Sequence, residues 1–163
     1  MKRLIAASAL VLAAAPLGAQ TGEAMVAAKN PQGILAALEG AGYDAELTED
    51  GTGDPMILTR LSGWSTRIYF YGCDETSHDG CDALQFSAGF DRKEPWTAEE
   101  ALALARKYRF SSTFLDDEGD PYIEWDVITG DGIPAPVFLA SVLSFSDAID
   151  VARREAFAGE TVE

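Results

Sequence analysis

The fold is decided by the stretch Ser65–Phe90, which reads STRIYFYGCDETSHDGCDALQFSAGF. Apolar and polar residues alternate in its first part, where Ile68 and Phe70 share one face, and they alternate again over Cys81–Phe90. A period of two residues predicts two half-buried strands. The short polar segment between them predicts a hairpin that buries one face and exposes the other.

The second face of the first strand carries Arg67, Tyr69 and Tyr71. Aromatic and arginine side chains are enriched at protein interfaces, so these three residues are a candidate interaction face. The alternative is that the two tyrosines pack locally against the disulfide proposed below and the next strand. The alternation pattern does not decide between these two interpretations.

Residues 1–19 have the layout of a secretory signal peptide, because Lys2 and Arg3 precede an uncharged apolar run, Leu4–Ala15. We expect cleavage between Ala19 and Gln20 and a periplasmic or secreted mature protein. The run is too short to span a bilayer. No later apolar run looks long enough to do so, and we expect no membrane contact after the leader is removed.

The mature chain is strongly acidic. Of 12 basic and 27 acidic residues, two basic and no acidic ones lie in the leader, which leaves 10 basic and 27 acidic residues and a formal charge of −17. A charge of this size and sign repels phosphate backbones, so we expect no nucleic-acid partner. The mature length suits one domain with its own core.

Both cysteines of the chain and its single histidine, Cys73, Cys81 and His78, lie in the hairpin. Structural zinc ligands usually come in more closely spaced pairs, which argues against a metal site. The exported compartment is oxidising, and strand alternation places both cysteines on the face opposite the apolar residues. We predict a disulfide between Cys73 and Cys81, and an exposed His78 without an orienting partner or a catalytic role.

The remaining elements follow from periodicity and from turn residues. Helices are predicted over Pro31–Ala41 and Thr97–Tyr108 and from the last loop to about Ala156, and strands over Tyr43–Thr48, Met56–Leu61, Phe110–Leu115 and Tyr122–Ile128. The order α-β-β-β-β-α-β-β-α predicts an α+β fold, with an antiparallel sheet of about six strands covered by helices on one face. We place the domain at 30–157, after a lead at 20–29 and before a tail at 158–163.

Two acidic turns, Glu49–Pro55 and Asp116–Pro121, close on the same Gly-Asp-Pro sequence. Their carboxylates match a calcium loop in residue type but not in spacing, and turn chemistry explains them equally well. A small-molecule or calcium binder is therefore the second interpretation of the chain. A hydrolase is the third, because pairs such as Glu124 and Asp126 arise by chance among 27 acidic residues. No metal, cofactor or catalytic residue is predicted.

Four stretches resemble secreted bacterial members of the YbjN domain family: Ala36–Leu47, Phe70–Cys73, Leu84–Asp91 and, most specifically, Tyr108–Val127. The family is described as a regulator of sensory transduction, and its fold is similar to that of type III secretion chaperones. The resemblance implies a non-catalytic domain that binds an unknown protein or peptide partner.

The helix before the Arg-Phe pair departs from the pattern of the family. Relatives usually carry a polar, tryptophan-containing patch in the helix before the Arg-Phe pair, whereas Leu102, Leu104 and Ala105 occupy that region here. A function that rests on this patch is therefore not expected.

The apolar stripe of the last helix is wide, and its surplus width could join two copies of the chain in a homodimer.

Overall fold

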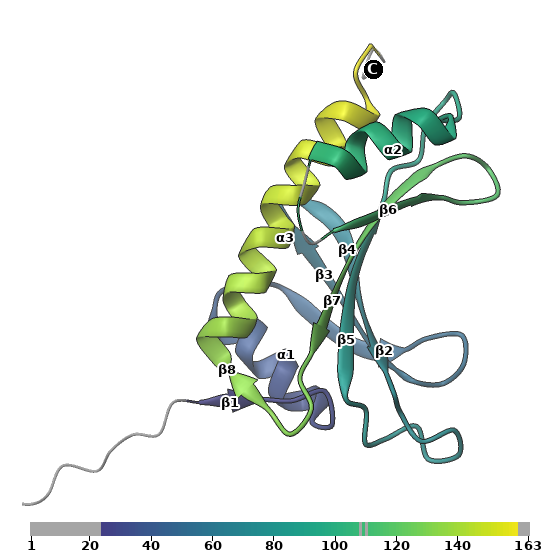
Figure 1. Ribbon diagram of the computed structural model, residues 1–163. Helices are drawn as coiled ribbons and strands as arrows, with labels where there is room; N and C mark the ends of the chain where they lie inside the picture. The colour runs from purple at the N-terminus through teal and green to yellow at the C-terminus, as the bar shows by residue number, and fades with distance from the viewer. Residues whose placement is uncertain (1–23, 108, 110, 160–163) are drawn as a thin grey trace, which may run out of the picture.

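The structure is a computed structural model that describes residues 24–107, 109 and 111–159 (Figure 1). The expected leader, its cleavage site and the last residues of the tail lie outside this range. The elements in chain order are β1 (Met25–Val26), α1 (Pro31–Gly40), β2 (Ala45–Glu49), β3 (Pro55–Leu61), β4 (Trp64–Tyr71), β5 (Ala83–Gly89), α2 (Ala98–Lys107), β6 (Ser112–Leu115), β7 (Pro121–Ile128), β8 (Ile133–Pro134) and α3 (Ala135–Ala156).

Six strands form one antiparallel sheet in the order β2-β3-β4-β5-β7-β6, so the predicted α+β fold is confirmed. The predicted central hairpin forms with Ile68 opposite Phe86 and Phe70 opposite Leu84. The strand that follows α2 does not join β5. It lies at the edge, and β7 pairs with β5 instead.

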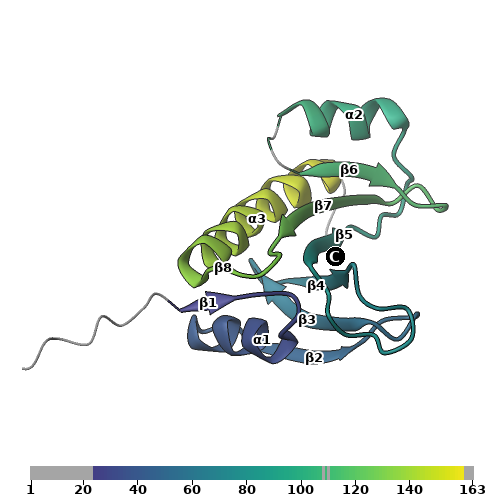
Figure 2. The same cartoon turned by 60° about the horizontal axis from the view of Figure 1, so that its bottom comes forward.

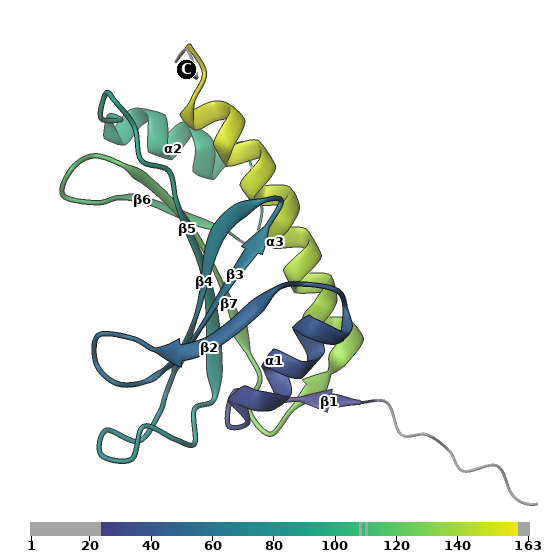
Figure 3. The ribbon, with the colours of Figure 1, turned by 180° about the vertical axis from the view of Figure 1, so that it is seen from behind.

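Helices α1 and α3 lie on the same face of the sheet (Figures 1 and 3). α3 turns a stripe toward the strands at steps of three and four residues, and its buried members are Phe138, Val142, Phe145, Ile149, Ala152 and Ala156. The ring of Phe86 lies 6.1 Å from that of Phe138 and 5.6 Å from that of Phe145. Burying a phenylalanine side chain contributes about 1.5–3 kcal/mol, so these contacts between α3 and β5 stabilise the core.

By length and composition, α3 is the one helix in the described part of the chain that could cross a membrane. This corrects the expectation that no later apolar run is long enough. The buried stripe of α3 lies on the sheet, however (Figure 2). Because the core helix of a folded domain passes the same length and composition test, packing against the sheet explains the apolar character of α3.

The segment before α1 belongs to the domain, at least from residue 24 onward. β1 pairs with β8, and Val26, Ala27 and Ala28 are buried. The backbone N–H of Ala28 donates to the Thr129 hydroxyl at 2.8 Å, and that hydroxyl donates to the carbonyl of Asp82 at 3.0 Å. The separate lead expected at 20–29 is therefore corrected for residues 24–29, because strand β8 supplies the pairing that a two-residue strand needs.

α2 begins with a capping box, in which Thr97 and Glu100 satisfy each other's backbone N–H groups. The backbone N–H of Thr97 donates to the Glu100 carboxylate at 2.8 Å, and the N–H of Glu100 donates to the Thr97 hydroxyl at 3.3 Å. The backbone N–H and the hydroxyl of Thr97 both donate to the Glu100 carboxylate and lower the pKa of Glu100 below its ordinary value. α2 packs against β6, and its Lys107 contacts Glu155 of α3 at 2.8 Å.

Candidate interaction face

The face of the sheet opposite α1 and α3 has no covering helix among the described residues (Figures 1 and 3). We call it the open face and define it by the outward residues of the four central strands. They are Met56, Leu58 and Arg60 of β3, Ser65, Arg67, Tyr69 and Tyr71 of β4, Ala83, Gln85, Ser87 and Gly89 of β5, and Tyr122, Glu124, Asp126 and Ile128 of β7. Alternation of the strands separates these residues from the core.

The structure places all three residues of the predicted interaction face, Arg67, Tyr69 and Tyr71, on this open face. Tyr71 is 48% exposed and Arg67 is exposed, whereas Tyr69 is half-buried. The two tyrosine rings lie 6.5 Å apart. The tyrosines therefore pack on one another, and they still present aromatic surface to solvent.

Sequence analysis missed a second aromatic pair on the same face. The ring of Tyr122 stacks on that of Phe114 of β6, with centroids 5.2 Å apart and an angle of 18° between the planes. Tyr122 also lies over Gly89, where an added Cβ would come within 2.5 Å of the tyrosine ring. Because Gly89 has no side chain, the Tyr122 ring can lie directly against the backbone of β5. Strand pairing across β5 and β7, which no local pattern reveals, produces this contact.

Between the two aromatic pairs lie two carboxylates, Glu124 and Asp126. Nε2 of Gln85 donates to Oδ1 of Asp126 at 3.0 Å, and the Tyr71 hydroxyl donates to Oε1 of Gln85 at 3.4 Å. Burial raises the pKa of Glu124, the negative charge of Asp126 raises it further, and a hydrogen bond with Ser87 lowers it in part. Burial and the charge of Glu124 also raise the pKa of Tyr71.

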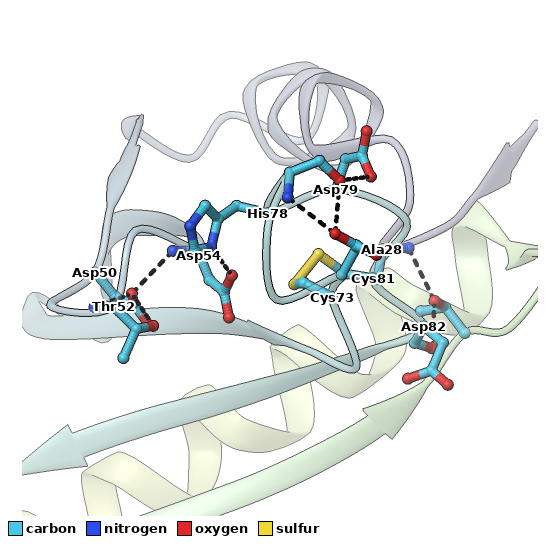
Figure 4. Close-up of a disulfide and its surroundings, with 12 residues drawn as sticks. Ala28, Asp50, Thr52, Asp54, Cys73, His78, Asp79, Cys81 and Asp82 are labelled. Carbon is cyan, nitrogen blue, oxygen red and sulfur yellow. Dashed lines mark hydrogen bonds and ion pairs between the residues drawn. A yellow bond between two sulfur atoms is a disulfide. The ribbon is translucent and has the colours of Figure 1, made fainter.

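The predicted disulfide between Cys73 and Cys81 is present (Figure 4). The reason given for it from strand alternation is wrong, because β4 ends at Tyr71 and β5 begins at Ala83. Both cysteines lie in the connecting loop, and Cys81 is buried as part of the core rather than outward-facing. The bond closes the base of this loop.

His78 has an orienting partner, which corrects the expectation of a solvated bystander. Its Nδ1 lies 2.8 Å from Oδ1 of Asp54 in the β2–β3 turn, so an N–H there would donate to the carboxylate (Figure 4). The pair could be two members of a Ser-His-Asp triad. The neighbouring Ser77 hydroxyl donates to Asp79 at 2.7 Å and to Asp74 at 3.1 Å, however, and not to His78.

An open hollow of about 480 Å³ lies beside this pair, between the start of α1 and the β2–β3 turn, with His78, Ser77 and Glu49 in its wall. Without a contact between nucleophile and base, these side chains show no arrangement for acyl transfer. Among the described residues, no group of three or more His, Cys, Asp and Glu side chains could hold a metal ion.

The carboxylates of the acidic turns are held by their own turns. Asp50 accepts hydrogen bonds from the backbone N–H groups of Thr52 and Asp54, and Asp116 accepts those of Glu118 and Asp120. Such hydrogen bonds are the ordinary use of aspartate in a turn. The geometry therefore gives no support to the calcium interpretation.

The fold and the open face together define a small α+β domain with a single sheet covered on one side. A sequence model of the YbjN family, described as "Putative bacterial sensory transduction regulator", matches residues 30–157. The chain belongs to this family.

The crystal structure of YbjN from E. coli, described as "a putative transcription regulator", is similar with a TM-score of 0.63. The two share 15% sequence identity, and the match covers 84% of this chain and 97% of that one. At this level of identity the likeness confirms the fold alone.

A second protein is similar over part of the sequence. The chloroplastic peroxiredoxin Q of Sedum lineare is 29% identical over 101 residues, which cover 55% of this chain and 51% of that protein. The chain thus spans about half the length of this curated relative. A match of this extent does not define the family of the chain, and the two described cysteines are bonded to one another.

Proposed function

We propose that this YbjN-family chain is an exported, non-catalytic interaction module, and that its open face binds a protein or peptide partner. The observation that carries the proposal is the concentration of partly exposed aromatic side chains on a sheet face that no described helix covers. Exposed apolar surface of this kind marks interaction sites, and aromatic residues supply much of the energy at interfaces.

Three observations support a non-catalytic role. The family is described as a regulator. The disulfide leaves neither Cys73 nor Cys81 as a thiolate, the form that cysteine chemistry requires. The hydroxyl of Ser77 is engaged by carboxylates rather than by His78. Export is supported by the leader at 1–19 and by the disulfide, which persists in oxidising compartments.

The open face is tested by replacing single residues with a photo-crosslinking amino acid in the expressed full chain. Tyr71 lies on the open face and is 48% exposed, and Leu143 lies on α3 and is 59% exposed, which makes it a matched control. We expect crosslinks to a partner from position 71 and few from position 143. Crosslinks from position 143 to a second copy of the chain would support the homodimer through α3 instead and contradict our proposal.

Export is tested separately by cell fractionation and by mass spectrometry of the N-terminus. The expected mature protein begins at Gln20 and contains no free thiol. A cytoplasmic protein that retains residues 1–19 would overturn the export part of the proposal and leave the open face untouched.

A further inference from the structure

The open face has a central row of small or short side chains between two rows of larger ones. On β5 the outward residues are Ala83, Gln85, Ser87 and Gly89, and only Gln85 is long. β4 and β7 flank this row, at about 10 Å from each other, because neighbouring strands are about 4.8 Å apart. Arg67, Tyr69 and Tyr71 stand on the β4 side, and Glu124, Asp126 and Ile128 stand opposite them on the β7 side. Aromatic and acidic side chains thus face each other across β5.

The β7 side of this row carries negative charge, and Arg67 stands opposite Glu124 across Ser87 on the β4 side. Neither Glu124 nor Asp126 forms an ion pair with another residue that the structure describes. Asp126 is exposed and has the Gln85 amide as its hydrogen-bond donor, and Glu124 has the Ser87 hydroxyl. Burial raises the pKa of Glu124, and the charge of Asp126 raises it further, so the two carboxylates act on each other along β7.

The charge of the whole chain restricts which kind of partner can bind the open face. The full sequence has a formal charge of −15, and the mature chain would have −17. A second copy of the chain or an acidic protein would be repelled at long range, whereas a positive segment would be attracted. Aromatic rings add to this, since ammonium and guanidinium groups bind favourably over a tyrosine face.

We propose that the open face docks a basic peptide segment of a partner protein in extended form along β5. A lysine or arginine side chain of that segment lies between the Tyr71 ring and the carboxylates of Glu124 and Asp126. This inference rests on the proposed function and specifies the chemistry of the partner.

The test measures binding of three fluorescein-labelled decapeptides to the purified protein by fluorescence anisotropy. The peptides share alternating leucine and valine residues, and the intervening positions are all lysine, all glutamine or all glutamate. We expect the lysine peptide to bind most tightly, and its Kd to rise about tenfold when salt increases from about 20 mM to 300 mM, because salt screens exposed charges.

Variants locate the binding site. E124Q/D126N should weaken binding of the lysine peptide about tenfold, and Y71A should weaken it about threefold to tenfold, as expected when charge pairs and a cation–π contact are lost. The matched control E39Q/D147N removes two exposed carboxylates from α1 and α3, and we expect less than a twofold change. Neither double substitution removes buried apolar surface, and circular dichroism melting checks that each variant is folded.

The outcomes separate this inference from the proposed function. Equal binding of the lysine and glutamine peptides, with both weakened by Y71A, would overturn the basic partner and leave the interaction face standing. An equal loss in E39Q/D147N and E124Q/D126N would also overturn the inference, because general charge attraction would then explain the binding. If no peptide bound and no crosslink formed at position 71, the proposed function itself would be wrong.

Discussion

The β2–β3 turn and the β6–β7 turn have almost the same sequence, DGTGDP over Asp50–Pro55 and DDEGDP over Asp116–Pro121. They also have the same backbone hydrogen bonds. In each, the leading aspartate accepts from the N–H groups two and four residues further on. Each glycine before the last aspartate has a positive φ, 97° and 84°. The local conformation is therefore set by the turn sequence alone.

The two turns differ in what their closing aspartates contact. Asp54 binds His78 in the disulfide-closed loop, where the histidine side chain is 37% exposed. Asp120 is buried and accepts the backbone N–H of Arg92 at 2.9 Å, which anchors the segment between β5 and α2. One turn supports an exposed loop and the other supports the core of the domain. We therefore expect the same turn sequence to contribute differently to the free energy of unfolding at the two places.

The largest expected difference is at the turn glycines. A Cβ at Gly119 would lie 2.5 Å from Cβ of Pro95, whereas one at Gly53 would lie 3.3 Å from the end of the His78 ring, which can move. Both substitutions to alanine also incur left-handed backbone strain of about 1–2 kcal/mol. We expect G119A to lower the free energy of unfolding by about 3 kcal/mol and G53A by about 1–2, since overpacking adds to the first. Urea denaturation measures both, and equal losses would contradict the comparison.

The disulfide should matter for one turn and not for the other. Opening a loop of this size by C73A/C81A should reduce the free energy of unfolding by about 2–3 kcal/mol in the chain-entropy model. In this background the loop that carries His78 is no longer closed, so adding D54A should have almost no further effect. D120A should retain its full cost, because Arg92 is remote from the disulfide in the fold. A loss of additivity at Asp120 would show that the two turns are coupled.

The closing aspartates themselves should differ by a smaller amount. D120A leaves a backbone N–H near the core without its acceptor, which costs about 1–3 kcal/mol. D54A removes a half-exposed contact between a carboxylate and a histidine ring, and exposed pairs of this kind contribute about 0–1 kcal/mol. Urea denaturation at neutral pH compares the two, and hydrogen exchange at Arg92 and His78 reports which loop is released. A greater loss from D54A would reverse our assignment of the structural role.

The smallest expected effect is the pH dependence due to Asp50. Burial is the largest single influence and raises its pKa, but the hydrogen bonds from Thr52, Asp54 and Gly53 together outweigh it and lower the pKa below the ordinary 3.8. The folded state therefore binds this proton less tightly than the unfolded state does. The resulting stability is present above about pH 4 and is lost as the pH falls through the lowered pKa. D50N should make the free energy of unfolding fall less steeply as the pH drops below about 4, which denaturation curves at a series of pH values would measure. An unchanged pH dependence would contradict the expectation.

Much of the fold follows from local sequence. The alternation around Ile68 and Phe86 predicts the central hairpin, and the stripe from Phe138 to Ala156 predicts the covering helix, because each pattern reports which side of an element is buried. The capping box at Thr97 and the turn at Asp50 are set by neighbours within a few residues. For the same reason, alternation predicts that Arg67, Tyr69 and Tyr71 share a face without showing whether that face is covered.

Other features depend on residues far apart in the chain. The pairing of β5 with β7 brings Tyr122 over Gly89 and Glu124 toward Tyr71, and the small β1 strand exists because β8 lies beside it. The contact of His78 with Asp54 joins two loops that are 24 residues apart. Strand alternation could not locate Cys73 and Cys81, since the strands end before them.

The sequence by itself determined the alternating faces, the helix stripe and the conformation of the two turns, because these depend on neighbouring residues. The tertiary structure alone decided which face stays open, which carboxylates gather there and which closing aspartate is buried. These properties arise from long-range packing, and a local pattern carries no information about what lies across the sheet.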